Sequence, residues 1–498
     1  MTSPVAHPAT GASSGRPGEG AVAGARWLTV AQVVTQVTRT GVQILLARLL
    51  LPSDFGLMAM ALVVTNFLDI FRDLGTRAAI IQRREVTPTI LSSLFYVNVG
   101  FGVALSLGVA LLAPLAAALL GDGNVTPVLQ VLGLSIALSS FGLVQLGLLY
   151  RDMRYRWIGA LHVTSALVQA GVSVGLALSG FGVWSLVGGT LAGALASTLL
   201  AWLASSWRPS WSFSASEVRS VWSFSLNLSG SHLVGFLVGN LDKVIIGRLL
   251  GTTSLGYYTL AQRILMYPIR SITQMAQEVL LPSMARRQDD DEALTDQFMR
   301  AGAVIALTTF PLMAIAAVLA EPFVRVVLGE QWLPAAPLIA VLGPVGALQS
   351  LNYTVSALYQ AKGRTDWLLR FGVVAGVVYV LGYVIGARWG LMGVAVGYTV
   401  AVLVLTYPAF AIPFRLIGAS TRAYARVVAP FAVGAILASA AARGTLELLA
   451  TMNVIEPVAL ALAAPAGLVP YALLLWLLRP GGVDDAARVV GLGRLLRN

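Results

Sequence analysis

Long apolar stretches follow one another along almost the whole chain, and they constrain its fold more than any other feature. A helix that crosses a lipid bilayer needs about 20 mostly apolar residues, and about fourteen stretches meet this requirement. They lie near residues 27–50, 55–76, 89–119, 126–149, 156–178, 181–204, 218–241, 253–282, 298–320, 333–359, 366–387, 390–412, 424–441 and 455–478. Only 11% of the residues are charged, against about 25% in a soluble domain. The sequence therefore predicts an all-α, polytopic membrane protein.

Several kinds of site are excluded by what the sequence lacks. The chain has no cysteine and only three histidines, which lie far apart, so we expect no disulfide, no metal centre and no bound cofactor. It has no glycine-rich loop with a lysine for nucleotide phosphates, so we expect no ATP hydrolysis. The loops on one side are short, whereas a membrane glycosyltransferase or polymerase needs a water-facing loop with catalytic acids or histidine. We therefore expect a protein that is not an enzyme.

Positive charges gather in alternate loops. Of the 33 Lys and Arg residues, we count 22 on one side of the spans and five on the other. Because basic loops stay in the cytoplasm, both termini are expected there, and the net charge of +11 requires no nucleic-acid partner. Arg48 and Arg248 belong to the poorer side, where we expect them to anchor helix ends at the interface by snorkelling.

The two halves of the sequence resemble each other. Residues 44–56 align without gaps on residues 244–256, and a second match relates Pro127 and Trp157 to Pro337 and Trp367. A repeat of six helices is even-numbered, which predicts two lobes related by a pseudo-two-fold axis along the membrane normal. The expected divisions are a disordered tail (1–25), an N-lobe of six helices (26–209), a C-lobe of six (210–415), two further helices (416–480) and a second cytoplasmic tail (481–498).

Polar residues recur at helical spacing inside the first two spans of each lobe, and ionisable residues at such depth usually face a cavity. Amides, an aromatic ring and arginines suit sugar hydroxyls and a pyrophosphate. The candidates for substrate binding are Arg39, Gln36, Gln43, Arg263, Tyr267, Arg270 and Gln274; those for ion coupling or gating are Asp69, Arg72, Asp73, Asp242, Lys243 and Glu278. Asp242 and Lys243 are placed near the outer end of the seventh span. The alternative is that these charges form structural ion pairs, as Arg72 could with Asp69 or Asp73.

Two motifs resemble those of bacterial polysaccharide-transport flippases of the multidrug/oligosaccharidyl-lipid/polysaccharide exporter superfamily. One is residues 48–56 with Asp73-Leu-Gly75 and residues 80–83; the other is residues 241–251 with Leu255-Gly-Tyr-Tyr258 and Ala261. The resemblance implies a two-lobed bundle that alternates between inward-open and outward-open states. It implies an undecaprenyl-pyrophosphate-linked oligosaccharide as cargo and coupling to an ion gradient, Na⁺ or H⁺.

This resemblance places the chain in the bacterial inner membrane, in lipopolysaccharide or exopolysaccharide biosynthesis, with the polymerase and glycosyltransferases of the same pathway as possible partners. A lipid II flippase and a drug/cation antiporter of the same superfamily are alternatives within transport. A membrane-embedded glycan polymerase or glycosyltransferase is a third alternative, from another class.

Overall fold

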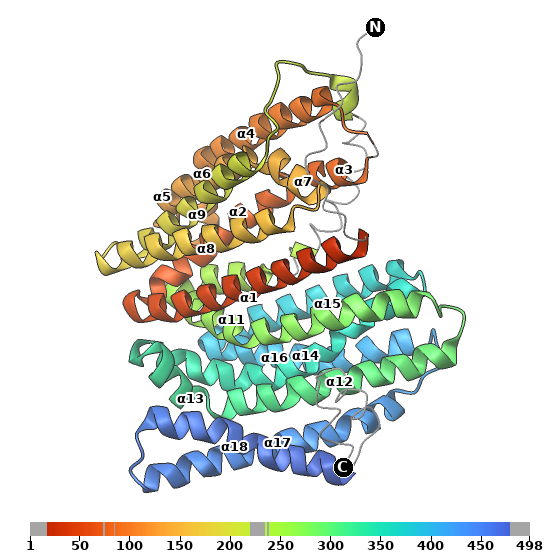
Figure 1. The fold of residues 1–498 in the computed structure, drawn as a ribbon. Helices are drawn as coiled ribbons and strands as arrows, with labels where there is room; N and C mark the ends of the chain where they lie inside the picture. The colour runs from red at the N-terminus through yellow and green to blue at the C-terminus, as the bar shows by residue number, and fades with distance from the viewer. Residues whose placement is uncertain (1–16, 73–74, 84, 220–234, 237–238, 479–498) are drawn as a thin grey trace. The chain divides into compact units, whose positions relative to one another are not determined.

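The computed structural model describes residues 17–72, 75–83, 85–219, 235–236 and 239–478, and every regular element in these ranges is helical (Figure 1). The elements of the first half are α1 (Pro17–Leu49), α2 (Pro52–Arg72), α3 (Thr76–Gln82), α4 (Pro88–Leu120), α5 (Val125–Leu132), α6 (Leu134–Ser140), α7 (Leu143–Arg151), α8 (Tyr155–Leu178) and α9 (Val183–Ala204). Those of the second half are α11 (Leu241–Ala285), α12 (Asp291–Val318), α13 (Ala320–Phe323), η1 (Val324–Leu328), η2 (Glu330–Ala335), α14 (Ala336–Ala361), α15 (Thr365–Gly386), η3 (Ala387–Trp389), α16 (Gly390–Phe414), α17 (Thr421–Thr451) and α18 (Glu456–Leu478).

The length and apolar character of these helices confirm a multi-pass membrane protein. Within the described ranges, nine helical stretches are long and apolar enough to cross a membrane, or ten if the bent run α5–α7 is one span. Neither α1 nor α11 is among them. The polar residues that recur at helical spacing in both helices lower their mean hydropathy. The count of fourteen spans stays a prediction.

Two predicted boundaries are wrong. The helix α1 begins at Pro17, so residues 17–25 are helical rather than part of a disordered tail. The seventh span was expected to end near residue 241, but α11 begins there and continues to a kink at Gly251, where φ is +81°. The charged pair Asp242–Lys243 looked like a helix end in the sequence. In the structure the pair lies in the first turn of α11, and both side chains form hydrogen bonds within the protein.

The fourth predicted span, 126–149, is broken into α5, α6 and α7, with a bend of 44° between the first two helices and α7. The break falls at Gly142, where a Cβ atom would lie 3.3 Å from the Cα atom of Thr198 on α9. Close approach of α9 therefore requires a residue without a side chain at this bend.

Packing divides the chain into two compact units. The first comprises Met1–Leu46, Val64–Ala113 and Pro127–Leu233; the second comprises Ala47–Val63, Pro114–Thr126 and Val234–Asn498. Short segments from the first half of the sequence, at the ends of α1 and α4 and in the first part of α2, therefore pack with the second half. The predicted lobes of 26–209 and 210–415 stay a prediction.

The two copies of the aligned motif contact each other within the second unit. A Cβ atom on Gly56 would overlap the carbonyl oxygen of Thr252, and one on Gly256 would overlap the carbonyl oxygen of Pro52. Each glycine thus meets the residue four positions before its counterpart. A reciprocal contact of this kind is the pattern that two-fold-related segments produce, and it supports the internal repeat.

Arg48 and Arg248 make related contacts with helix ends, and the expectation that they also anchor these ends at the lipid interface by snorkelling stays a prediction. Arg48 donates hydrogen bonds to the carbonyl oxygens of Val326 and, at 2.9 Å, of Val327, at the end of η1. Arg248 donates to the carbonyl oxygen of Ala118 at 3.3 Å, at the end of α4. The last carbonyls of a helix lack partners within it and carry the negative end of its dipole. Each arginine therefore caps a helix from the other half of the sequence.

Candidate functional site

The polar face of α11 beyond its kink is the clearest candidate surface in the second unit. Arg263, Tyr267 and Arg270 are all exposed, whereas Leu265 and Ile269 on the opposite face are completely buried. The predicted stripe is therefore a real face of the helix that the rest of this unit does not cover. The side chains of Gln274 and Glu278, which continue the stripe in sequence, lie outside the described residues.

Lys243, which lies before the kink, is a third cation near this face. It lies close enough to Asp242, Arg263 and Arg270 for its charge to interact with all three. Its Nζ atom donates a hydrogen bond of 2.7 Å to Oδ1 of Asn240. Among the side chains that the structure describes, Arg263 and Arg270 form no ion pair. The described side chains of this region therefore comprise three cations and one carboxylate.

Asp242 is only 4% exposed and is held by two polar side chains from α11 itself. Its Oδ2 atom accepts hydrogen bonds of 3.0 Å from the hydroxyl of Tyr258 and from Nε2 of Gln262. Its Oδ1 atom is buried and has no hydrogen-bond partner in the described part of the chain. A buried carboxylate with a free oxygen can accept a proton or bind a small cation. The expected place of Asp242 near the outer end of a span stays a prediction, and its burial within the protein is a finding of the structure.

A group of tyrosines surrounds this carboxylate. Tyr383 of α15 and Tyr398 of α16 stack with ring centroids 5.4 Å apart, and both lie close enough to Asp242 for electrostatic interaction. Gln349 of α14 donates a hydrogen bond to the hydroxyl of Tyr398. Sequence reasoning missed Tyr258, Gln262 and these residues. The spacing of Tyr379 and Tyr383, four residues apart in one span, was the signal that could have found part of the group.

The first unit contains a second set of polar residues, on α1. Arg39 is exposed and lies close enough to His162 of α8 for their charges to interact. Gln36 donates a hydrogen bond of 3.0 Å to Thr40. The Nε2 atom of Gln43 is buried and has no partner among the described residues. Each of these three predicted residues thus has side-chain polar atoms that the described part of the protein does not fully use in hydrogen bonds. Their position relative to α11 stays a prediction.

Asp69 and Arg72 of α2 form an ion pair, with Nη1 of Arg72 3.2 Å from Oδ1 of Asp69. The structural alternative of the sequence analysis therefore applies to this pair. Asp73, its other predicted member, lies outside the described residues. Within the described ranges, no three His, Asp or Glu side chains come together in a way that could hold a metal ion.

Comparison with known proteins decides the family. Residues 45–337 match the family described as polysaccharide biosynthesis protein. The chain belongs to this polysaccharide biosynthesis protein family. The matched range contains both copies of the internal repeat motif, Asp242 and the polar face of α11.

Two relatives of this polysaccharide biosynthesis protein are named for the same process. The chain is 27% identical over 414 residues to the lipopolysaccharide biosynthesis protein WzxC of Escherichia coli, covering 82% of this chain and 83% of WzxC. It is 32% identical over 299 residues to the succinoglycan biosynthesis transport protein ExoT of Rhizobium meliloti, covering 60% of each chain. Among solved structures, the lipid II flippase MurJ in an inward closed conformation superposes with a TM-score of 0.68. That superposition covers 93% of this chain and 99% of MurJ at 13% identity, which shows a shared fold.

Proposed function

We propose that this protein is a flippase that moves an undecaprenyl-pyrophosphate-linked oligosaccharide, a repeat unit of a lipopolysaccharide or exopolysaccharide, across the inner membrane. The family supports a role in polysaccharide biosynthesis, and one relative is named as a transport protein. The observation that carries the proposal is the group of three cations formed by Lys243, which is partly buried, and by Arg263 and Arg270, which the rest of their unit leaves exposed.

The physical reason lies in the cargo. A pyrophosphate that leaves water loses a large solvation free energy, and fixed cations in a region of low dielectric can compensate for that loss. Arginine binds such an oxyanion through two parallel N–H donors. Tyr267, on the same face, offers a ring and a hydroxyl to a sugar. Arg39, Gln36 and Gln43 on α1 provide the corresponding surface of the other lobe.

Transport by alternating access requires the two lobes to open in turn toward each side of the membrane. The reciprocal contact between residues 52–56 and 252–256 is suited to close one side, with Arg48 and Arg248 as caps. Asp242 is the best placed group for ion coupling, with Na⁺ or H⁺ as the coupling ion. Replacement of Asp242 with Asn should then remove the dependence of export on the ion gradient; gradient-driven export that persists unchanged would exclude Asp242.

The proposal places the protein in the bacterial inner membrane with both termini in the cytoplasm and no catalytic activity. The pathway's polymerase and glycosyltransferases are partners to test. The family match separates this function from a drug/cation antiporter. A lipid II flippase is the second candidate, because MurJ shares the fold. Loss of a lipid II flippase would stop peptidoglycan synthesis and growth, and loss of a repeat-unit flippase would stop export of one glycan.

The decisive experiment is deletion of the gene followed by measurement of lipid-linked glycans in the membrane. A flippase mutant should accumulate the complete repeat unit on its lipid carrier in the cytoplasmic leaflet, where it stays protected from an impermeant glycan-modifying enzyme. A truncated glycan would identify a glycosyltransferase instead. Single repeat units that reach the outer leaflet without being joined would identify a polymerase.

A further inference from the structure

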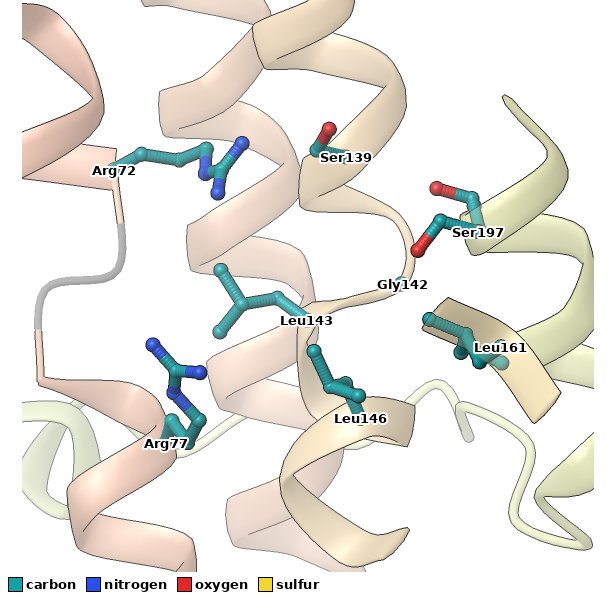
Figure 2. A pocket seen from close by; sticks show the side chains of 10 residues that line it. Arg72, Arg77, Ser139, Gly142, Leu143, Leu146, Leu161 and Ser197 are labelled. Atoms are coloured by element: carbon teal, nitrogen blue, oxygen red, sulfur yellow. The ribbon is translucent and has the colours of Figure 1, made fainter. Parts of the chain in front are cut away.

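A pocket of about 170 Å³ lies inside the first unit, and no residue of α1 lines it (Figure 2). Arg72 at the end of α2 and Arg77 on α3 form one side of it. Ser139 of α6 and Ser197 of α9 lie on the other side. The volume corresponds to roughly five or six water molecules, which is room for a phosphate or pyrophosphate group.

Among the residues that the structure describes, which do not include Asp73, every charged side chain that lines the pocket is a guanidinium, and the remaining polar side chains of the lining are hydroxyls. The N-terminus of α7 at Leu143 also borders it, and Gly142, which precedes this helix, provides no side-chain cap. Asp69 balances part of the charge of Arg72 and does not line the pocket. Hydroxyls and guanidinium groups with a helix N-terminus are a set of donors, which suits an oxyanion.

An unsatisfied donor points to the same chemistry. The Nε atom of Arg72 is buried, and it has no hydrogen-bond partner in the described ranges of the chain. The guanidinium is paired with Asp69 through Nη1, but a buried donor atom that lacks an acceptor still costs stability. An oxyanion in the pocket would provide the missing acceptor.

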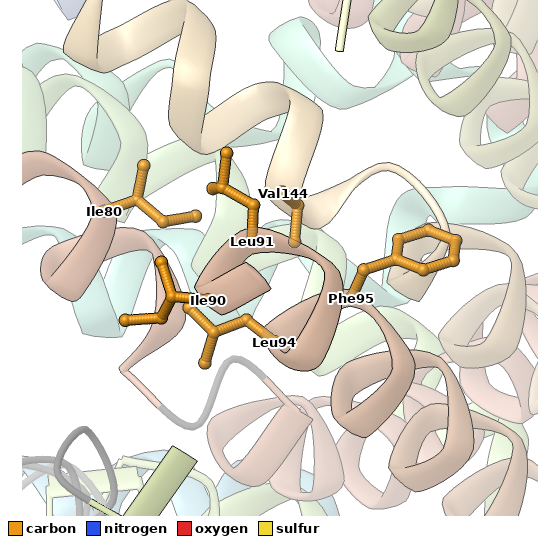
Figure 3. Packing of buried hydrophobic residues seen from close by; sticks show 6 residues of the cluster. All are labelled: Ile80, Ile90, Leu91, Leu94, Phe95 and Val144. Carbon is orange, nitrogen blue, oxygen red and sulfur yellow. The ribbon is translucent and has the colours of Figure 1, made fainter. Parts of the chain in front are cut away.

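The pocket has a rigid frame. Ile80 of α3 and Val144 of α7 are buried in one hydrophobic cluster with Ile90, Leu91, Leu94 and Phe95 of α4 (Figure 3). In addition, Arg151 at the end of α7 donates hydrogen bonds of 2.6 and 2.8 Å to the carbonyl oxygens of Ile80 and Arg83, at the end of α3. The two elements that border the pocket are thus fixed to each other, and Arg77 is held in place relative to α7.

We infer that this pocket binds the phosphate group of a lipid phosphate ester, as a site separate from the cationic face of α11. Leu143, Leu146, Leu161 and Ala201 line the rest of the cavity, so a ligand with a carbon stem beside its phosphate fits better than a free ion. Two sources share this chemistry, a polyprenyl phosphate or pyrophosphate carrier and a phospholipid headgroup. The inference does not depend on the proposed export function.

A cysteine in the pocket tests the inference directly, because the chain has no cysteine of its own. Ser197→Cys is placed in purified full-length protein in phosphatidylcholine nanodiscs and reacted with a small neutral thiol reagent. Farnesyl phosphate, at ten times its dissociation constant, should slow the reaction about tenfold by occupying the site. Inorganic phosphate should require a higher concentration. Thr190→Cys, on the same helix but outside the pocket lining, should show no protection, and Ser139→Cys is the second reporter if the first variant does not fold.

Variants of Arg72 separate specific binding of the phosphate group from nonspecific effects of the added compound on cysteine reactivity. Arg72→Gln should abolish protection in the Ser197→Cys background, while Arg72→Lys should retain part of it, because lysine keeps the charge but not the fork. Protection by phosphatidylglycerol alone, added to the nanodiscs, would identify a phospholipid as the ligand. If no phosphate compound slowed the reaction, or if protection survived Arg72→Gln, the inference would be overturned. The readout is local, so its failure is distinguishable from failure of the export proposal.

Discussion

At the scale of single residues, the arginines of this protein fall into two groups, those that cap helix ends and those that are assigned to the cargo. Arg48, Arg248 and Arg151 cap the carbonyl ends of helices, so their charge is used within the fold. Arg263 and Arg270 are exposed on α11 and form no ion pair with the side chains described. Ionisable residues within a membrane usually face a cavity or a partner, and the proposed function therefore assigns these two arginines to the cargo.

Replacing Arg270 with Ala should lower export of the glycan about tenfold to a hundredfold, because a charge-assisted hydrogen bond contributes roughly 1.5–3 kcal/mol. Arg270→Lys should rescue export only in part, since lysine cannot make the forked contact. Export is measured as polymer at the cell surface, normalised to folded protein in the membrane.

Arg300→Ala is the matched control, because Arg300 pairs with Asp296 at 2.9 Å on an exposed part of α12. Normal export by Arg270→Ala would contradict the cargo role. If Arg270→Ala reduced the amount of folded protein while Arg300→Ala did not, Arg270 would be a structural residue.

At the scale of helices, the contact between the two repeat motifs depends on two glycines. The first turns of α2 and the α11 segment after Gly251 approach so closely that a side chain at position 56 or 256 would overlap a backbone oxygen. The contact is reciprocal, so the same requirement appears in both copies of the repeat. Glycine at both positions is therefore a packing requirement of this crossing.

Gly56→Ala and Gly256→Ala should each destabilise the folded protein by about 1–3 kcal/mol, the usual cost of overpacking. Thermal unfolding of the protein in nanodiscs measures the effect. Gly41→Ala provides the control on α1, because a Cβ atom there would have no neighbour within 4 Å. Equal unfolding temperatures for Gly56→Ala and Gly41→Ala would show that the close approach does not occur in the membrane.

At the scale of the whole molecule, the orientation in the membrane follows from the distribution of Lys and Arg. Single cysteines in the loops at Arg83–Arg84, Arg154–Arg156 and Arg286–Arg287 should stay unlabelled by an impermeant thiol reagent in intact cells. Cysteines at Gly121–Asn124 and Gly329–Gln331 should be labelled. Permeabilised cells, in which all five positions should react, provide the control. Labelling of the first three loops in intact cells would reverse the topology.

The sequence by itself determined the class of fold and the family resemblance. A bilayer restricts the folds open to a chain this apolar, because every backbone polar group within it must be hydrogen-bonded inside the protein. Helical spacing was sufficient to place Arg263, Tyr267 and Arg270 on one face, since residues three and four apart share a side of a helix. The repeat was detected separately, by the gapless alignment of the residues around Gly56 and Gly256.

Only the tertiary structure decided which polar groups have hydrogen-bond partners and which residues those partners are. Asp242 looked like the end of a span, and its hydrogen bonds come from Tyr258 and Gln262, 16 and 20 residues further along a helix that bends at Gly251. Arg48 looked like an interfacial anchor, and its acceptors lie almost 280 residues away in the chain. The pocket at Arg72 joins helices from four parts of the sequence. Local periodicity reports the face on which a residue lies, but the partner on that face is set by long-range packing.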